Sequence, residues 1–261
     1  MTPRRIIEAR AAQLAGRGPL VCTPLVGRTG SAVLAELEVV LPKGPDLLEW
    51  RLDHLEGIER TEEVLALGRA VRARAGEVPL ILTCRSTREG GRPVRLGEAG
   101  VLDLYQAACR AGLADYLDQE LSSAPADLAR ARALSREAGV GLIVSFHDFG
   151  GTPPEAELVA TLRRARQAGA DVAKLAVMPR APEDVLTLLA ATQRGRRELD
   201  VPLITMAMGA LGASSRLVGW TFGSTVSFAV GAAASAPGQL PVEALRRVNE
   251  ILTGALGDRE P

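Results

Sequence analysis

The chain alternates short apolar runs with longer amphipathic runs, and this alternation constrains its fold more than any other feature. Each apolar run has the length and composition of a buried strand, and each amphipathic run has the spacing of a helix with one apolar face. The apolar runs cover residues 20–26, 46–53, 79–84, 115–120, 141–146, 171–179, 202–206 and 224–230. The helical runs cover residues 31–40, 61–75, 99–111, 126–138, 154–168, 182–193, 214–220 and 241–256.

This number of strand–helix units in one chain predicts an α/β fold, a (β/α)8 TIM barrel. A doubly wound open sheet, the alternative, usually has fewer strands. No low-complexity tract or long linker divides the sequence, so we predict a single barrel domain over residues 1–261, with a catalytic core at about residues 19–256. Catalytic residues of such barrels lie at the carboxyl ends of the strands and in the loops that follow them.

Lysine is used sparingly in this sequence. The chain has 31 lysine and arginine residues, but only Lys43 and Lys174 are lysines. Lys174 lies in the apolar run at residues 171–179, and Ala176 on the same face of that strand leaves room for a ligand. A guanidinium keeps its proton in proteins, whereas a desolvated amine can lose it and then attack a carbonyl carbon. We therefore interpret Lys174 as a Schiff-base lysine.

Two structural interpretations of Lys174 stay open at this point. A buried lysine can be held by a carboxylate, and a lysine near the end of a strand can extend its amine to solvent. Perturbed ionisable residues mark functional sites only statistically, so this run alone does not decide between the three interpretations.

Three charged residues share one face of the second predicted strand. Glu49, Arg51 and Asp53 alternate with Trp50 and Leu52, so the charged side chains point the opposite way from the apolar ones. Charges inside a barrel are costly unless they pair with each other or with a ligand. We expect Arg51 near the substrate, with Glu49 and Asp53 compensating its charge; the alternative is an edge strand with solvated charges.

The third and fifth predicted strands end in polar residues. Arg85 follows the third strand and suits a carboxylate or a hydroxyl, although alone it would be interpreted as an ordinary loop arginine. His147 follows the fifth strand, where an imidazole can move protons in both directions near neutral pH. Because the fifth and sixth strands are neighbours in a barrel, His147 and Lys174 should lie side by side. Such a pair suits proton abstraction next to a carbonyl group.

The last two strands add apolar and hydrogen-bonding groups. Met206 and Met208 end the seventh strand, either as core residues or as an apolar cover that keeps water from an imine. Arg216 begins the next helical run, and Ser235 and Gln239 lie in the loop after the eighth strand. A cation, a hydroxyl and an amide without a glycine-rich phosphate cradle fit a carboxylate better than a phosphate.

Composition narrows the possible partners and location. Lys plus Arg equals Asp plus Glu, so the formal net charge is zero and does not favour nucleic acid or an anionic membrane. The first residues lack the apolar run of a signal peptide, and no stretch has membrane-spanning length. The three widely spaced cysteines indicate free thiols in a reducing compartment, and the two histidines do not complete a metal cluster. We expect a cytoplasmic protein without metal.

Eight short motifs resemble one known family, type I 3-dehydroquinate dehydratase, the Schiff-base-forming dehydroquinase. The motifs occur in the family's order over nearly the whole chain, from about residue 20 to about residue 252. They are Glu49-Trp-Arg-Leu-Asp-His54, Thr83-Cys-Arg-Ser86 with Glu89-Gly-Gly, Ser145-Phe-His-Asp-Phe149, Asp171-Val-Ala-Lys-Leu-Ala176, Met206-Ala-Met-Gly209, Ser215-Arg216, Phe222-Gly-Ser224 and Ser235-Ala-Pro-Gly-Gln239.

The resemblance implies a homodimeric barrel that uses no cofactor and no metal. It implies syn elimination of water from 3-dehydroquinate to give 3-dehydroshikimate, the third step of the shikimate pathway to chorismate and the aromatic amino acids. In this chain it makes Lys174 the imine-forming lysine, His147 the general acid and base, and Glu89 the residue that orients His147. The remaining implied positions are substrate-binding or supporting ones: Glu49, Arg51, Arg85, Arg216, Ser235, Gln239, Met206 and Met208, with Asp53 and His54 supporting.

One residue departs from the family pattern. Pro24 stands where some members carry a serine in the first strand, and Thr23 is the neighbouring hydroxyl that could replace it. The resemblance also implies that burial beside Arg51, Arg85 and Arg216 disfavours the ammonium form of Lys174.

Two other functions share part of this pattern. A class I aldolase would use the same lysine and barrel but would cleave a carbon–carbon bond, usually in a phosphorylated sugar, and the missing phosphate cradle argues against it. A barrel that binds a small acid without turnover would not require both His147 and Lys174.

Overall fold

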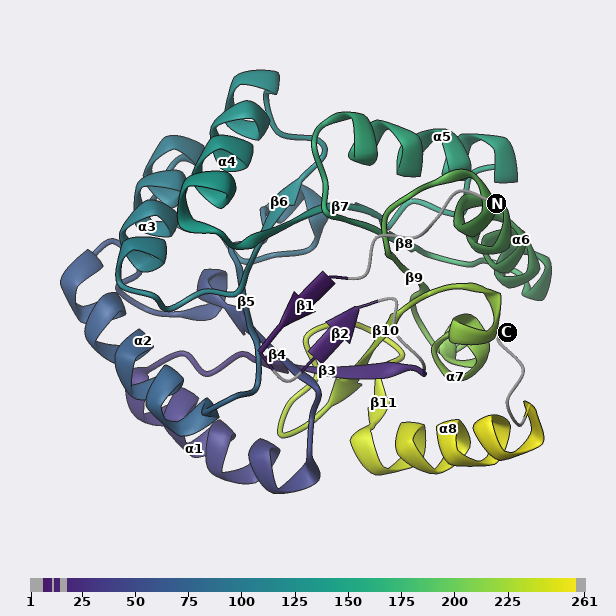
Figure 1. The fold of residues 1–261 in the computed structure, drawn as a ribbon, viewed down its shortest axis with the longest axis horizontal. Helices are drawn as coiled ribbons and strands as arrows, with labels where there is room; N and C mark the ends of the chain where they lie inside the picture. Colours follow the sequence, from purple (N-terminus) through teal and green to yellow (C-terminus); the bar gives the residue numbers. More distant parts are fainter. Residues whose placement is uncertain (1–6, 11, 15–17, 257–261) are drawn as a thin grey trace.

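Eight parallel strands form a curled sheet in the computed structural model, which describes residues 7–10, 12–14 and 18–256 (Figure 1). The strands are β3 (Leu20–Leu25), β4 (Leu47–Arg51), β5 (Leu80–Thr83), β6 (Tyr116–Glu120), β7 (Gly141–Asp148), β8 (Val172–Val177), β9 (Leu203–Ala207) and β10 (Val226–Val230). They follow one another in chain order around the sheet, and β10 returns to pair with β3. The predicted (β/α)8 barrel is therefore confirmed.

A helix follows each strand and lies on the outside of the barrel (Figure 1). The helices are α1 (Gly30–Val40), α2 (Thr61–Ala75), α3 (Glu98–Arg110), α4 (Pro125–Ala138), α5 (Glu155–Gln167), α6 (Pro182–Glu198), α7 (Ala213–Phe222) and α8 (Val242–Leu256). A two-residue strand, β11 (Leu240–Pro241), pairs with β10 just before α8. In the part of the chain that the structure describes, no helix is long and apolar enough to cross a membrane.

The alternation of side chains along the strands creates two separate apolar layers. Residues such as Ile81, Tyr116 and Ile204 pack inside the barrel, whereas Trp50 and Leu82 pack between the sheet and the helices. The side chains of both layers are almost completely buried. Because each strand is buried on both faces, its sequence is mostly apolar. Glu49 and Lys174 are among the exceptions, and their charged side chains reach the site.

A short hairpin before the barrel was not predicted. It consists of β1 (Ile7–Ala9) and β2 (Ala12–Leu14), which pair antiparallel. Ala12 and Leu14 are buried and join the inner apolar layer, so the hairpin contributes to the barrel interior. The first five residues, predicted to lack a signal peptide, lie outside the described residues.

Two strand ends differ from the prediction in ways that matter for the site. The strand predicted at residues 46–53 ends at Arg51 and continues as a 3-10 turn, η2 (Leu52–His54). The strand predicted at residues 141–146 is longer, since β7 extends to Asp148 and includes His147. The charged run of β4 thus turns away from the sheet, while His147 is held by strand geometry.

Side-chain hydroxyls complete the seam between β9 and β10. The backbone bridge here is isolated, between Leu203 and Ser224. The Ser224 hydroxyl accepts the Thr205 N–H at 3.0 Å, and the Ser215 hydroxyl accepts the Ala207 N–H at 2.9 Å. These hydroxyls satisfy two amides of β9 that a neighbouring strand would otherwise bond.

Candidate active site

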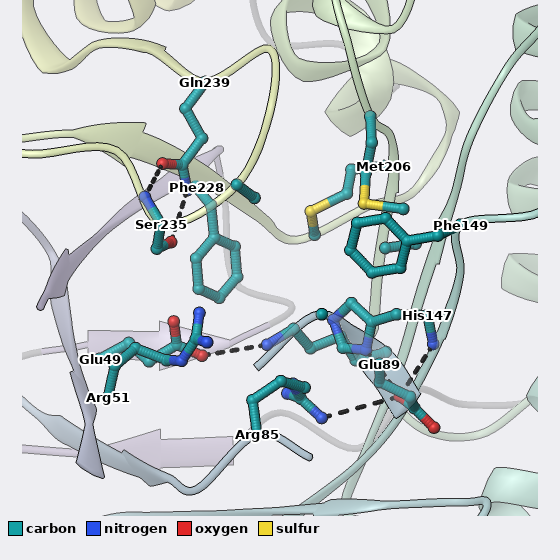
Figure 2. A pocket seen from close by; sticks show the side chains of 15 residues that line it. Glu49, Arg51, Arg85, Glu89, His147, Phe149, Met206, Phe228, Ser235 and Gln239 are labelled. Carbon is teal, nitrogen blue, oxygen red and sulfur yellow. Dashed lines mark hydrogen bonds and ion pairs between the residues drawn. The ribbon is translucent and has the colours of Figure 1, made fainter. Parts of the chain in front are cut away.

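A polar cavity opens at the carboxyl ends of the strands (Figure 2). Its empty volume, including the open mouth, is about 450 Å³. Residues from six strands and the loops after them line it: Glu49, Arg51, Arg85, Glu89, Gly90, His147, Phe149, Lys174, Ala176, Met206, Met208, Phe228, Ser235, Ala236 and Gln239.

The Lys174 side chain reaches this cavity from the middle of β8 and is 4% exposed. Its Nζ donates to Asp118 Oδ2 at 2.9 Å and to Glu49 Oε1 at 3.2 Å. The nitrogen also lies 4.5 Å from the centroid of the Phe228 ring, within range of a cation–π interaction. The interpretation of Lys174 as a lysine held by carboxylates is therefore confirmed. The amine also lines the cavity, and its interpretation as a Schiff-base lysine stays a prediction.

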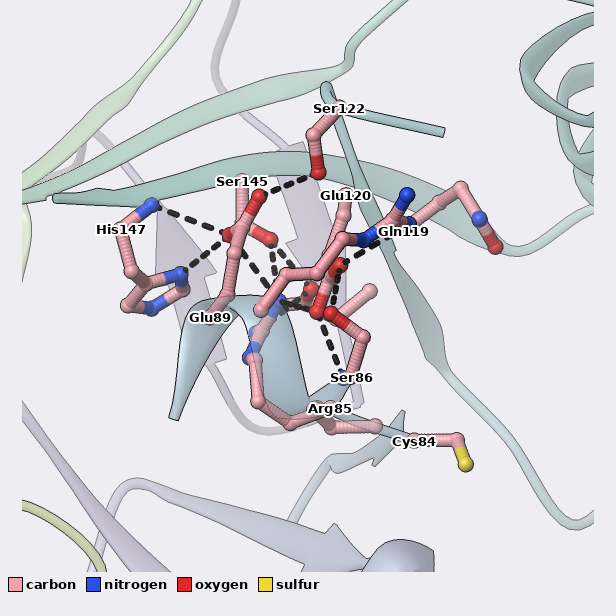
Figure 3. A network of polar contacts seen from close by, with 12 residues as sticks. Cys84, Arg85, Ser86, Glu89, Gln119, Glu120, Ser122, Ser145 and His147 are labelled. Carbon is pink, nitrogen blue, oxygen red and sulfur yellow. Dashed lines mark hydrogen bonds and ion pairs between the residues drawn. The ribbon is translucent and has the colours of Figure 1, made fainter. Parts of the chain in front are cut away.

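Asp118 is the centre of a buried charge network that the sequence analysis did not identify. Figure 3 shows the part of this network around Arg85, Glu120 and Ser145. Its Oδ1 accepts from Arg85 Nη2 at 2.8 Å and from Ser145 Oγ at 2.6 Å, while its Oδ2 accepts from Lys174. Burial raises the pKa of Asp118, but the Arg85 and Lys174 cations outweigh this effect and hold the pKa well below its usual range. Asp118 is therefore ionised at neutral pH.

The Arg85 guanidinium forms ion pairs with three acidic side chains. It donates to Asp118 and, through Nη1, to Glu120 Oε1 at 3.2 Å, and Nη1 lies 3.8 Å from Glu89 Oε2. Because these carboxylates already occupy much of the guanidinium, Arg85 acts on the cavity partly by organising its acidic residues.

His147 lies beside Glu89, which a short 3-10 turn, η3 (Thr87–Glu89), carries in from the loop after β5. Glu89 Oε2 accepts the His147 backbone N–H at 3.0 Å and lies 2.9 Å from Nδ1, while Ser122 Oγ donates to Glu89 Oε1 at 2.6 Å. When Nδ1 carries the proton that Glu89 accepts, Nε2 is the free basic nitrogen.

The environment of this pair sets its protonation. Burial lowers the pKa of His147 well below its usual value, and the nearby Arg85 and Lys174 cations lower it further. Burial raises the pKa of Glu89 to about 7, and the charge of Glu120 adds to that shift. The imidazole is neutral at neutral pH and is therefore ready to accept a proton.

Gly91 allows the turn that carries Glu89 to fold back against Arg85. A Cβ at Gly91 would lie 1.9 Å from the Arg85 carbonyl oxygen, whereas a Cβ at Gly97 would meet no atom within 4 Å. We expect Gly91→Ala to lower the free energy of unfolding by about 1–3 kcal/mol, because backbone must move to admit the methyl group. Gly97→Ala is the matched control, and equal chemical-denaturation midpoints for the two variants would contradict this prediction.

The β4 residues lie as their alternation predicts, up to the end of the strand. Glu49 and Arg51 line the cavity, are 3% and 6% exposed, and so exclude the edge-strand alternative. Asp53 is not on the strand but on η2, where its two oxygens accept Arg51 Nε and Nη2, both at 2.8 Å. Asp53 and His54 lie outside the cavity lining; Asp53 contacts it through Arg51, and His54 Nε2 lies 3.7 Å from Asp53 Oδ2.

The wall formed by the last strands is mostly apolar. Met206 and Met208 line the cavity. Ser235 and Gln239 also line it and bond to each other, with Gln239 Nε2 donating to Ser235 Oγ at 3.1 Å. Arg216 lies behind this wall rather than in the lining, and its Nη2 donates to the Pro237 carbonyl at 3.2 Å.

Arg216 is a buried cation without an acidic neighbour. Within residues 7–10, 12–14 and 18–256, no carboxylate lies at ion-pair distance from it, and its Nε has no hydrogen-bond partner. Burial lowers its pKa to about 10, which is the expected effect when no anion compensates the charge. This corner of the site is therefore suited to an anionic group of a ligand.

The structure corrects two details of the sequence analysis. The Lys174 nitrogen lies against two carboxylates instead of among three arginines, and Arg216 is not in the same lining. Thr23 faces outward, where its methyl lies with Val40 beside Gly231, so it does not replace the missing serine hydroxyl of the first strand. The side-chain period of two in β3 places Thr23 on the opposite face from Cys22, which packs inside the barrel.

Asp118 and Ser145 are the main residues that sequence reasoning missed. The signal was present for Asp118, because Asp118 and Glu120 stand two residues apart in an apolar strand, the same pattern that drew attention to Glu49 and Arg51. Among the residues that the structure describes, no group of three or more His, Cys, Asp or Glu side chains could hold a metal ion.

Comparison with known proteins gives consistent results. The family model described as type I 3-dehydroquinase matches residues 21–255. A protein of Aromatoleum aromaticum named 3-dehydroquinate dehydratase is 53% identical over 257 residues, which covers 98% of this chain and 99% of the relative.

Solved structures agree with this match. The crystal structure of 3-dehydroquinate dehydratase from Geobacillus kaustophilus superposes with a TM-score of 0.94 at 49% identity, covering 97% of this chain and 98% of the other. A type I 3-dehydroquinate dehydratase from Clostridium difficile, crystallised with covalently modified comenic acid, has a TM-score of 0.93 at 32% identity, covering 97% and 99%.

Proposed function

This chain belongs to the type I 3-dehydroquinase family, and on that premise we propose that it is a hydro-lyase that eliminates water from 3-dehydroquinate to give 3-dehydroshikimate through a Schiff base on Lys174. One observation supports this proposal above the others: a buried primary amine and a neutral imidazole from neighbouring strands line the same cavity. In the organism the reaction would be the third step of the shikimate pathway.

The proposed first stage is covalent. The Lys174 amine attacks the ketone carbon of the substrate, and loss of water leaves a protonated imine. The positively charged nitrogen withdraws electrons and makes a proton on the adjacent carbon more acidic. Ala176, on the same face of β8 two residues further on, is small enough to leave space beside the nitrogen.

The proposed second stage uses His147 twice. Its neutral imidazole removes the proton from the carbon next to the imine, and an enamine forms. The enamine expels the hydroxyl group on the next carbon, and protonated His147 supplies the proton that makes it leave as water. Because one group acts as base and then as acid from one side, the elimination is syn. Hydrolysis of the imine then releases the product and the free amine.

The substrate carboxylate has a defined place in this scheme. Arg216 is a buried cation whose charge no described carboxylate balances, and a ligand carboxylate would balance it. Ser235 and Gln239, which bond to each other in this structure, can redirect their hydroxyl and amide to the same ligand.

Borohydride reduction tests the imine directly. Wild-type protein incubated with 3-dehydroquinate and sodium borohydride should carry a secondary-amine adduct on Lys174, which peptide mass mapping will locate. The chain supplies its own control, because Lys43 is the other lysine and bonds to the Gly231 carbonyl away from the cavity. Lys43→Arg should trap the adduct normally and Lys174→Arg should trap none; wild-type turnover without an adduct would refute the proposed imine.

The pH dependence of kcat/KM should follow the ionisation of the Glu89 side chain. Its pKa of about 7 means that the side chain loses its negative charge as the pH falls below 7, and the charge stabilises the imidazolium that forms on His147. We expect kcat/KM to fall about tenfold per pH unit below pH 7. In Glu89→Gln this limb should disappear, and kcat/KM should stay about 10–100-fold below the wild-type value measured above pH 7.

Glu120→Gln is the control for that assignment. The charge of Glu120 helps to raise the pKa of Glu89, so removing it should move the acid limb to lower pH without abolishing it. An unchanged acid limb in Glu89→Gln would assign the titration to another group.

Three general properties complete the proposal. The described strands belong to one continuous sheet apart from the β1–β2 hairpin, which supports a single barrel domain. Cys22, Cys84 and Cys109 are free thiols, which fits a reducing compartment such as the cytoplasm. The homodimer rests on the family resemblance alone, and light scattering of the purified protein tests it.

A further inference from the structure

Two carboxylates contact the Lys174 nitrogen, and their surroundings differ. We propose that they have separate roles in the imine chemistry: Asp118 is a positioning residue that holds the nitrogen, and Glu49 is a catalytic residue that carries its proton. This inference rests on the proposed Schiff base at Lys174.

Asp118 is locked in place by its other partners. Besides Lys174, it binds the Arg85 guanidinium and the Ser145 hydroxyl, and its side chain has no exposed surface. Proton transfer to Asp118 would neutralise the partner of a fully buried arginine, which is costly in a buried site. Its depressed pKa agrees with this geometry. Asp118 can therefore fix the position of the nitrogen but is a poor acceptor for its proton.

Glu49 differs in both respects. Its Oε1 accepts from Thr83 Oγ1 at 3.0 Å and from Lys174 Nζ at 3.2 Å, and in the described part of the chain no arginine lies within ion-pair distance of it. Glu49 also lines the cavity, so its carboxyl group is on the side where the substrate carbonyl would lie. A general base must be within hydrogen-bond reach of the proton it takes, and Glu49 meets this condition.

In this scheme Glu49 carries each proton that moves during imine formation. The Lys174 ammonium gives one proton to the Glu49 carboxylate, and the neutral amine forms a bond to the carbonyl carbon. Glu49 returns the proton to the alkoxide oxygen, takes a second proton from the nitrogen, and delivers it to the hydroxyl group, which leaves as water. The nitrogen begins and ends with one positive charge, and Glu49 begins and ends as a carboxylate. Asp118 faces that positive charge in both states.

The charge of the nitrogen depends on groups from every side of the barrel. Those that face it are one cysteine, three acidic residues, two arginines and one histidine: Cys22 on β3, Glu49 and Arg51 on β4, Arg85 after β5, Asp118 on β6, Glu89 on η3 and His147 on β7. A pH experiment must therefore compare variants that each change one carboxylate and keep the rest.

Rapid-quench borohydride trapping between pH 6 and pH 9 separates the two roles. With 3-dehydroquinate, wild type should form the adduct at a rate that changes little with pH. In Glu49→Gln the rate should be about 10²–10³-fold lower near neutral pH and should rise about tenfold per pH unit, because solvent must now take the ammonium proton. In Asp118→Asn the rate should fall but stay nearly independent of pH, because Glu49 still carries the proton.

The opposite pattern, a pH slope in Asp118→Asn and none in Glu49→Gln, would overturn the assignment, and so would the same slope in both. If Asp118→Asn does not fold, Glu49→Asp against Glu49→Gln still decides the role of Glu49: the shorter carboxylate should keep the flat profile, and a slope in Glu49→Asp equal to that in Glu49→Gln would contradict it. A wild-type protein that forms no adduct would refute the proposed function itself, which is a separate result.

Discussion

Replacing Lys174 with alanine should lower kcat for the dehydration by at least about 10⁴-fold, the largest loss expected from a single substitution in this chain. The side chain supplies the nitrogen that becomes the electron sink, and no other described primary amine lies in the cavity. Lys174→Arg should be equally inactive, because a guanidinium keeps the charge but does not become a nucleophile. The measurement is the ultraviolet absorbance of the conjugated product, 3-dehydroshikimate.

The two variants of Lys174 also control for structure. Lys174→Ala leaves Glu49 and Asp118 without their common partner, so some loss of stability is expected, whereas Lys174→Arg keeps a cation there. Activity above about 1% of wild type in a folded Lys174→Arg protein would contradict the covalent mechanism.

Replacing His147 with alanine should slow the elimination by about 10³–10⁴-fold but should not prevent the imine from forming. Lys174 and its two carboxylates are intact in this variant. Borohydride should therefore trap an adduct with the mass of bound substrate, whereas Lys174→Ala traps nothing. This difference would assign carbon–nitrogen bond formation to Lys174 and proton transfer at carbon to His147.

His54 is the matched control, because it is the other histidine of the chain and lies outside the cavity lining. His54→Ala should lose far less activity than His147→Ala. Failure of His147→Ala to trap the adduct would mean that the imidazole is also required before the elimination, and the division between the two residues would be wrong.

The fold was predictable because local patterns of apolar residues identify its strands and helices. Each strand is buried on both faces, so each appears as a short apolar run, and the number and order of these runs determine a barrel. The hairpin at residues 7–14 was not predictable in this way, because two three-residue strands carry too little periodicity. The end of β4 was misplaced because Leu52 and Asp53 continue the alternation after the backbone has turned.

The site was predictable where a residue type was unusual for its place. Lys174 stood out in an apolar strand, and His147 stood out at a strand end. Asp118 carried the same two-residue spacing as Glu49 and Arg51, but this spacing does not identify its partners, because Arg85 and Lys174 lie 33 and 56 positions away in the chain. Sequence reasoning counted the cations that would surround the amine, but it had no local signal for which carboxylates would reach it first.

The serine hydroxyls that bond the amides of β9 also affect the position of Arg216. One backbone hydrogen bond joins the two strands here, from the Thr225 N–H to the Leu203 carbonyl at 2.7 Å. Further along β9 the bonds to its amides come from two serine hydroxyls, that of Ser224 before β10 and that of Ser215 on α7. Ser215 immediately precedes Arg216 on α7, so the hydrogen bond that holds this helix against β9 also helps to position the buried guanidinium.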